Sequence, residues 1–136
     1  MSWLTPKPGR LGTRHVQVFV PSLDRDQNPV PQGHGYWVRE ALTCLASLFG
    51  GATAFPVGLG AWRDDDRDGA ILTEDVVIVF SYVAEDDLAA AERPLYEFLM
   101  RLGRETRQGE VGVFVDGVYY GFHDFGAPVD HGGDKS

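Results

Sequence analysis

Four aspartates in one short segment have a spacing that metal sites use. Asp64, Asp66 and Asp68 lie two residues apart, a glycine follows, and Asp75 occupies the twelfth position counted from Asp64. This order approaches the EF-hand loop, in which alternate carboxylates surround calcium and the glycine permits a sharp turn. However, both flanking segments have the pattern of strands. The twelfth residue of an EF-hand loop is usually a glutamate, and here the glutamate, Glu74, comes one place early. We therefore interpret the segment as an acidic hairpin turn and keep calcium binding as the alternative.

Glu74 is also the acid that directly precedes a strongly apolar stretch of the chain. Trp62 and Arg63 lie across the expected hairpin from it, and Trp62 is expected opposite Ile71 near the tip. A carboxylate close to an indole ring and a guanidinium can serve as a general base or bind a polar ligand. We favour the simpler interpretation, a surface ion pair at the base of the hairpin, and keep the general base or ligand contact as the alternative.

Another candidate ligand site lies at the start of an expected helix, where His34, Tyr36, Trp37 and Arg39 follow closely on one another. These side chains suit a ligand pocket, for which Trp62 is a further candidate, or a capping turn with a packed aromatic ring. No pair of histidines has zinc-site spacing, and no glycine pattern matches a dinucleotide or phosphate loop. The sequence predicts no cofactor, with calcium as the one alternative.

Hydrophobic periodicity predicts seven helices and strands, which must position the candidate residues. Strands are expected in 14–22, 52–62 and 70–83 and on both sides of Asp116-Gly117 within 110–122, and helices in 36–51 and 85–108. Pro94 lies inside the second helix and must kink it or begin its second half.

The order of these elements predicts an α+β fold. A ferredoxin-like split βαβ sandwich with an extra C-terminal hairpin strand accommodates all seven elements. We expect residues 1–13 to form a flexible arm, 14–125 a single domain and 126–136 a disordered tail.

Strand alternation divides the sheet residues between a face that meets the helices and an open face. The helix side is expected to carry Val16, Val18, Val20, Val77, Val79, Val111, Val113 and Val115. The open face is expected to carry His15, Gln17, Phe19, Val76, Ile78, Phe80, Tyr82 and Phe114. An exposed apolar surface of this kind indicates an interaction site.

Three coverings of the open face compete. The N-terminal arm with Trp3, or the C-terminal tail, can fold over it, RNA bases can stack on it, or two copies of the chain can pack face to face. We favour a homodimer, which can enclose a ligand or an active site as in the dimeric α+β barrel monooxygenases. The expected interface residues are Phe19, Ile78, Phe80, Tyr82 and Phe114.

Composition limits the classes of partner. The chain has 136 residues and a net charge of −8, which disfavours binding to nucleic acid and to anionic membranes. No apolar run is long enough to cross a bilayer, and the N-terminus lacks the apolar core of a signal peptide. A cytoplasmic location is the default expectation. The lone cysteine, Cys44, is expected to be a buried packing residue.

The segments LFGGAT, Gly60-x-Trp62, an acidic turn with Gly69, and LTEDVVIV together resemble a group of small bacterial proteins of unassigned function. The resemblance covers residues 16–83. It implies a compact α+β domain of bacterial origin and carries over no catalytic residues.

From these observations we expect a small binding or accessory module that self-associates through its open face and takes a protein partner or a small-molecule ligand. The first alternative is a small enzyme, similar to a cofactor-independent oxygenase or isomerase, with its pocket inside the dimer. His15, Glu74 or Tyr82 would then point into the pocket. The second alternative is a calcium-binding protein.

Overall fold

The structure, a computed structural model, describes residues 14–126. The expected arm, and the expected tail from residue 127 onward, lie outside the described residues. The elements are β1 (Arg14–Pro21), α1 (His34–Phe49), β2 (Thr53–Ala54), β3 (Gly58–Asp64), the 3₁₀ turn η1 (Asp65–Arg67), β4 (Ala70–Val83), α2 (Glu85–Glu105), β5 (Val111–Val115) and β6 (Val118–Phe122). The expected α+β class is confirmed.

The strands form one 6-stranded sheet in the order β2-β4-β1-β5-β6, and β3 also pairs with β4. Every pairing is antiparallel. The expected strand 52–62 is divided, because Phe55–Val57, which contains Pro56, interrupts the ladder between β2 and β3. β4 is 14 residues long and therefore holds β2 at one end and β3 at the other.

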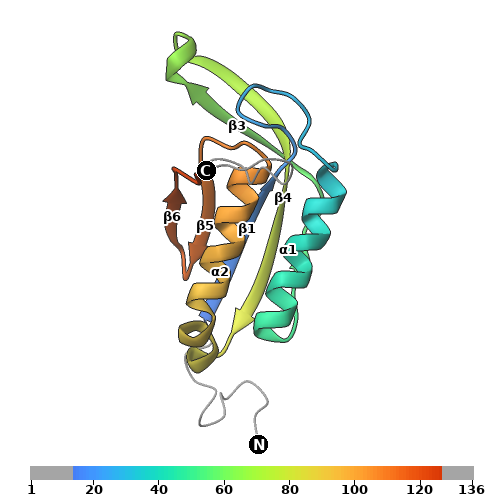
Figure 1. Ribbon diagram of the computed structural model, residues 1–136, viewed down its shortest axis with the longest axis vertical. Coiled ribbons are helices and arrows are strands. Elements are labelled where there is room, and N and C mark those ends of the chain that lie inside the picture. Colours follow the sequence, from blue (N-terminus) through green and yellow to red (C-terminus); the bar gives the residue numbers. More distant parts are fainter. Residues whose placement is uncertain (1–13, 127–136) are drawn as a thin grey trace, which may run out of the picture.

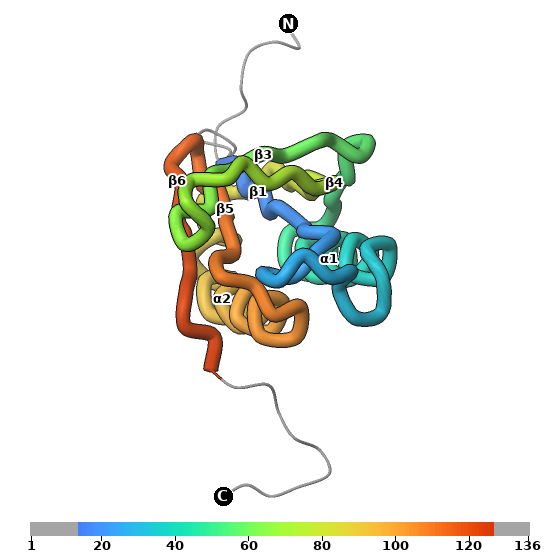
Figure 2. The backbone as a smooth tube through the Cα atoms, turned by 90° about the horizontal axis from the view of Figure 1, so that it is seen from above, coloured from blue at the N-terminus to red at the C-terminus, as the bar shows by residue number. Residues whose placement is uncertain are grey.

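The two helices lie side by side on one face of the sheet, which gives the molecule two layers (Figures 1 and 2). The alternating valines of β1, β4 and β5 fill the space between the layers, as expected, and all but the partly buried Val115 are buried. The valines pack against Trp37 and Leu45 of α1 and against Leu99 and Leu102 of α2. Burying each of these larger side chains contributes about 2 kcal/mol before entropy is subtracted. Within residues 14–126, the other sheet face meets no helix.

The ends of the helices follow from local backbone preferences. α1 ends at Gly50, whose φ of 92° is left-handed and whose N–H donates to the carbonyl of Ala46 at 2.8 Å. α2 begins with three acidic residues, Glu85, Asp86 and Asp87, which interact favourably with the positive end of the helix dipole. Pro94 lies on the exposed side, and α2 continues through it as one helix.

The turn between β5 and β6 has the predicted hairpin geometry. Asp116 and Gly117 both have positive φ, 54° and 82°, which a type I′ turn requires. The Asp116 carboxylate also accepts hydrogen bonds from the backbone N–H of His15 and from the side chain of Arg14. The turn is thereby attached to the start of β1.

No helix in the described part of the chain is both long and apolar enough to span a membrane.

Candidate functional site

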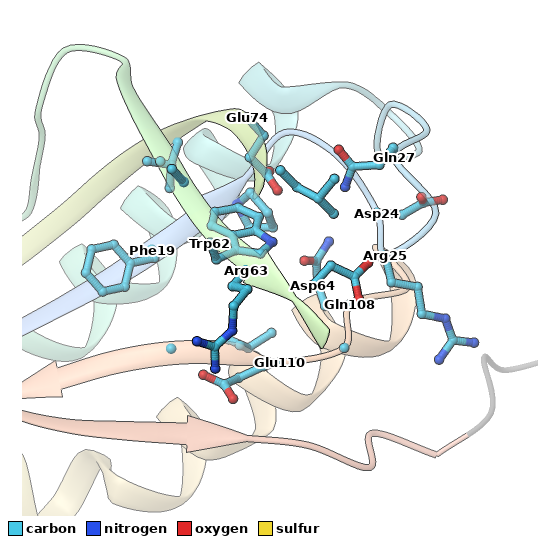
Figure 3. Close-up of a pocket in the computed structure, with 18 of the residues that line it drawn as sticks. Phe19, Asp24, Arg25, Gln27, Trp62, Arg63, Asp64, Glu74, Gln108 and Glu110 are labelled. Atoms are coloured by element: carbon cyan, nitrogen blue, oxygen red, sulfur yellow. The ribbon is translucent and has the colours of Figure 1, made fainter. Parts of the chain in front are cut away.

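A cavity of about 1070 Å³ lies on the open face near the end of β1. It extends from the β3–β4 hairpin on one side of β1 to β5 and β6 on the other, and the loop after β1 closes one end. The hairpin projects beyond the helices (Figure 1). Figure 3 shows Trp62 and Glu74 close together in the wall, with Phe19 farther along β1. We call this space the Glu74 cavity.

The register of the β3–β4 hairpin brings Trp62 into the cavity. Gly60 pairs with Glu74, and Trp62 pairs with Leu72. A Cβ atom on Gly60 would come within 3.1 Å of the Trp62 ring, so the missing side chain gives the ring room to lie against the strand. The expectation that Trp62 faces Ile71 is wrong by one residue. Because side chains alternate, that single step separates a residue of the cavity from one of the opposite face.

Glu74 is only 5% exposed, so the expectation of a surface ion pair at the base of the hairpin is wrong. Its Oε2 accepts hydrogen bonds from the backbone N–H groups of Ser22 at 2.7 Å and Leu23 at 3.0 Å, and the Ser22 hydroxyl lies 3.4 Å away. A carboxylate withdrawn from water needs such donors. These hydrogen bonds also hold the chain where it leaves β1. All three reach Oε2, so Oε1 is the oxygen that they do not engage.

Carboxylates outnumber guanidinium groups around the cavity. The acids are Asp24, Asp26, Asp64, Asp65, Asp66, Glu74 and Glu110, and the arginines are Arg25, Arg63 and Arg67. Arg63 lies 2.6 Å from Asp65, and Arg67 lies 3.4 Å from Asp64, so two of the arginines are paired within the hairpin tip. The cavity therefore favours cationic or neutral ligands over anions.

Asp24 is the other buried carboxylate of the cavity wall. One of its oxygens accepts the backbone N–H groups of Asp26 and Asn28, at 2.8 and 2.9 Å. The side-chain amide of Gln108 donates to the carbonyl of Leu23 at 2.9 Å. These contacts tie the loop after β1 to the segment before β5, so the closing end of the cavity is held in place.

The four aspartates of the calcium hypothesis do not come together. Asp64 caps the 3₁₀ turn by accepting the N–H of Asp66, whereas Asp75 pairs with Leu59 well along the ladder. Asp68 occupies the left-handed turn position, with φ of 58°. Within residues 14–126, no group of three or more His, Cys, Asp or Glu side chains is placed to hold a metal ion. The flanks are strands, as the hairpin interpretation requires.

The residues at the start of α1 have packing contacts and do not line the Glu74 cavity. The Nε2 of His34 lies 2.9 Å from the carbonyl oxygen of Val20, and the Trp37 indole donates to the carbonyl of Pro31 at 2.7 Å. Trp37 is almost fully buried, and Tyr36 packs edge-on against it, with 5.0 Å between ring centroids. Arg39 is exposed.

Cys44 is partly buried against the core, and burial raises the pKa of its thiol. A raised pKa leaves less reactive thiolate, which agrees with a packing role.

An aromatic row extends along the open face away from Glu74. His15 lies 5.5 Å from Phe80 and 5.2 Å from Tyr82 between ring centroids, and Phe55 stacks on Phe80 at 4.7 Å. Tyr82 is 69% exposed, whereas Phe80 is half-buried. Tyr82 lies eight residues from Glu74 along β4, or about 26 Å at the usual rise per residue. The three catalytic candidates therefore do not form one site.

The remaining expected interface residues are half-buried. Phe19 and Phe114 pack edge-on across β1 and β5, with 5.5 Å between centroids, and Ile78 lies on β4 between the cavity and Phe80.

The contribution of β5 and β6 to the cavity was not predicted from the sequence. Tyr119, Glu110 and Gly112 line it, and the Tyr119 hydroxyl donates to Glu110. The signal that could have revealed it was a pair of glycines, Gly112 and Gly121, inside two short strands. Glycine within a strand often marks a place where another group approaches closely.

No protein-family model matches the chain, and no curated protein matches it. The solved structures that are similar in fold include two structures of a SAM lyase. A phage SAM lyase in complex with S-methyl-5′-thioadenosine has 14% sequence identity and a TM-score of 0.62, and the similarity covers 90% of this chain and 96% of that chain. A phage SAM lyase in the apo state has 16% identity and a TM-score of 0.56, covering 88% and 95%. At these identities the comparison shows a shared fold.

Proposed function

We propose that the Glu74 cavity binds S-adenosylmethionine (SAM) and that the chain is a small SAM-cleaving lyase. The observation that carries the proposal is the buried carboxylate of Glu74 in a cavity wall next to the exposed ring of Trp62. The shared fold supports it, because the similarity to a SAM lyase extends over nearly all of both chains.

The chemistry of the lining suits this ligand. SAM combines a flat base with a sulfonium cation, and aromatic faces attract both kinds of group. Trp62 and Phe19 provide such faces. The excess of carboxylates matches the positive charge of the ligand, and it disfavours phosphate-bearing nucleotides of similar size.

The proposed reaction breaks a carbon–sulfur bond. The bonding electron pair goes to sulfur, so the sulfonium becomes the neutral thioether of S-methyl-5′-thioadenosine. The four-carbon fragment completes its valence through loss of a proton to water or through attack by its own carboxylate, and no oxidant, reductant or second substrate is needed. Glu74 binds and orients the cation through Oε1, while the N–H groups of Ser22 and Leu23 fix Oε2.

The test is product formation from SAM by the purified chain. We expect S-methyl-5′-thioadenosine to accumulate, measured by liquid chromatography, and Glu74→Gln to reduce the rate at least tenfold. Asp75→Asn is the matched control, because Asp75 is the neighbouring acid on the other face of β4 and is exposed. The lyase proposal is wrong if the wild type forms no product, and the binding proposal is wrong if it binds no SAM at millimolar concentration.

A second proposal concerns assembly, and the exposed Tyr82 with the stacked Phe55–Phe80 pair supports it. The open face packs against a second copy of the chain, which removes these rings from water. This self-association is compatible with the lyase and equally with a binding or accessory module. Light scattering after size exclusion tests it: a concentration-independent monomer would exclude it.

We also propose that the fold is ferredoxin-like. The order β2-β4-β1-β5 with two helices on one face is that expected of a split βαβ sandwich, and β6 is the added hairpin strand.

A further inference from the structure

Tyr119 on β6 lies on a platform of glycines. Gly112 of β5 pairs directly with Gly121 of β6, and Tyr119 pairs with Phe114. A Cβ atom on Gly112 would come within 2.5 Å of the Tyr119 hydroxyl, and one on Gly121 would come within 3.2 Å of its ring. The ring therefore lies back over the glycine pair, and an alanine at Gly112 has no room while the ring keeps this position.

A chain of polar contacts fixes the Tyr119 hydroxyl. The hydroxyl donates to Oε2 of Glu110, and the other oxygen of Glu110 lies 3.2 Å from Nε2 of His123. Nδ1 of His123 lies 3.2 Å from the carbonyl oxygen of Gly109. Burial, together with Glu110, raises the pKa of Tyr119, so the phenol stays a neutral donor. An aromatic ring that is 45% exposed is thus held at both its face and its hydroxyl.

The strand order places this ring and Glu74 on opposite sides of β1. β4 lies on one side and β5 and β6 on the other, and Glu74 and Tyr119 both line the same cavity. β4 and β6 are separated by three strand spacings, or about 14 Å. A cavity with a buried carboxylate at one side and a fixed aromatic ring at the other suits a ligand that has a cationic part and a flat part.

We propose that the cavity is polarised: Tyr119, oriented by Glu110 and His123 on the Gly112–Gly121 platform, contacts the base of the nucleoside, and Glu74 contacts the cation. This inference rests on the proposed function, because it assigns the two parts of that ligand to named residues. It makes Tyr119 a residue that determines specificity for a flat base.

Two probes separate the two ends of the cavity: SAM, which carries the cation, and S-methyl-5′-thioadenosine, which keeps the base but is neutral. Dissociation constants are measured by calorimetry on the full chain. We expect Tyr119→Leu to weaken both probes roughly 10- to 100-fold, the range of a lost base–aromatic stack. We expect Glu74→Gln to weaken SAM by a larger factor than the neutral thioether.

The matched control is Tyr120→Leu. Tyr120 is the next residue on the same strand, is exposed to a similar extent, and lines a different groove between α2 and β6. It should leave both dissociation constants unchanged. Tyr119→Phe keeps the ring but loses the hydrogen bond to Glu110 that orients it, and we expect it to weaken both probes by less than Tyr119→Leu does. Melting temperatures of all variants show which of them are folded.

The outcomes distinguish this inference from the proposed function. If the wild type and Tyr119→Leu bind both probes equally well, the polarised cavity is refuted and the proposed function stands. The polarised cavity is also refuted if Glu74→Gln weakens both probes by one factor, because the cation then has no separate contact there. If the wild type binds neither probe, the proposed function fails and the assignment of ligand ends fails with it.

Discussion

Substitution of Glu74 separates its structural role from its role in binding. Glu74→Ala removes the acceptor of the Ser22 and Leu23 N–H groups, which form hydrogen bonds of 2.7 and 3.0 Å in a nearly buried position. An unsatisfied buried donor costs about 1–3 kcal/mol. Both hydrogen bonds are partly buried, so for the two donors together we expect a loss of about 2–5 kcal/mol in the free energy of unfolding.

Glu74→Gln keeps an amide oxygen that can accept the same two hydrogen bonds. It loses the stronger bonding of a charged acceptor, and we expect a cost of about 1 kcal/mol. Its SAM affinity should nevertheless fall as far as that of Glu74→Ala, because both variants lack the negative charge.

The assay is urea unfolding followed by circular dichroism, with affinity measured on the same preparations. With a slope of about 1.5–2 kcal/mol per molar urea, the midpoint should fall by about 0.5 M for Glu74→Gln and by at least 1 M for Glu74→Ala. Equal destabilisation by the two variants would refute the reasoning, because the backbone acceptor would then not be what the carboxylate provides. A wild-type midpoint for Glu74→Ala would refute it as well.

Three other measurements test separate parts of the structure. Because Tyr82 is 69% exposed, Tyr82→Lys should leave the melting temperature almost unchanged while lowering the mass measured by light scattering to that of a monomer; an unchanged assembly mass would place the contact elsewhere. The pKa of Asp116 is lowered mainly by the hydrogen bond from Arg14 and next by the hydrogen bond from the backbone N–H of His15. This carboxylate therefore stabilises the fold above its ordinary pKa and loses that effect as the pH falls through the lowered value. Asp116→Asn should therefore lose stability at neutral pH and show a smaller further loss on acidification, whereas a parallel pH profile would contradict the pairing. Millimolar calcium or EDTA should leave the melting temperature unchanged, since Asp75 lies away from the hairpin tip; a rise with calcium would revive the metal hypothesis.

Patterns that act locally were sufficient to predict most of the elements, although the expected strand 52–62 is divided and the 3₁₀ turn was not predicted. The alternating valines of β1, the apolar stretch 70–83 and the Asp116-Gly117 turn each give a signal within a few residues, and the structure has the corresponding elements. The division of the strands into a buried and an open face also followed from alternation alone, because one register fixes every side chain of a strand.

The site depended on contacts that no local pattern encodes. Glu74 drew attention as an acid beside an apolar strand, but its donors at Ser22 and Leu23 lie 52 and 51 residues away in sequence. Trp62 was predicted in the correct hairpin but opposite Ile71, whereas it pairs with Leu72. The η1 turn, which sets the register, lies in the acidic segment. Tyr119 joins the cavity only because β5 pairs with β1.

The start of α1 illustrates the opposite case. His34 and Trp37 had the residue types of a ligand pocket, but their polar atoms face the carbonyl oxygens of Val20 and Pro31. Residue type alone does not distinguish a ligand contact from the satisfaction of a buried polar atom, since both need the same donors.

The most direct test of the central claim is to map where S-methyl-5′-thioadenosine binds, by nuclear magnetic resonance of the isotope-labelled chain. We predict saturable shifts of the Trp62 indole N–H and of the Ser22 and Leu23 amides, with the amides facing the groove between α2 and β6 unmoved. Shifts confined to that groove, or no saturable shift at millimolar ligand, would contradict the assignment of the Glu74 cavity as a nucleoside site.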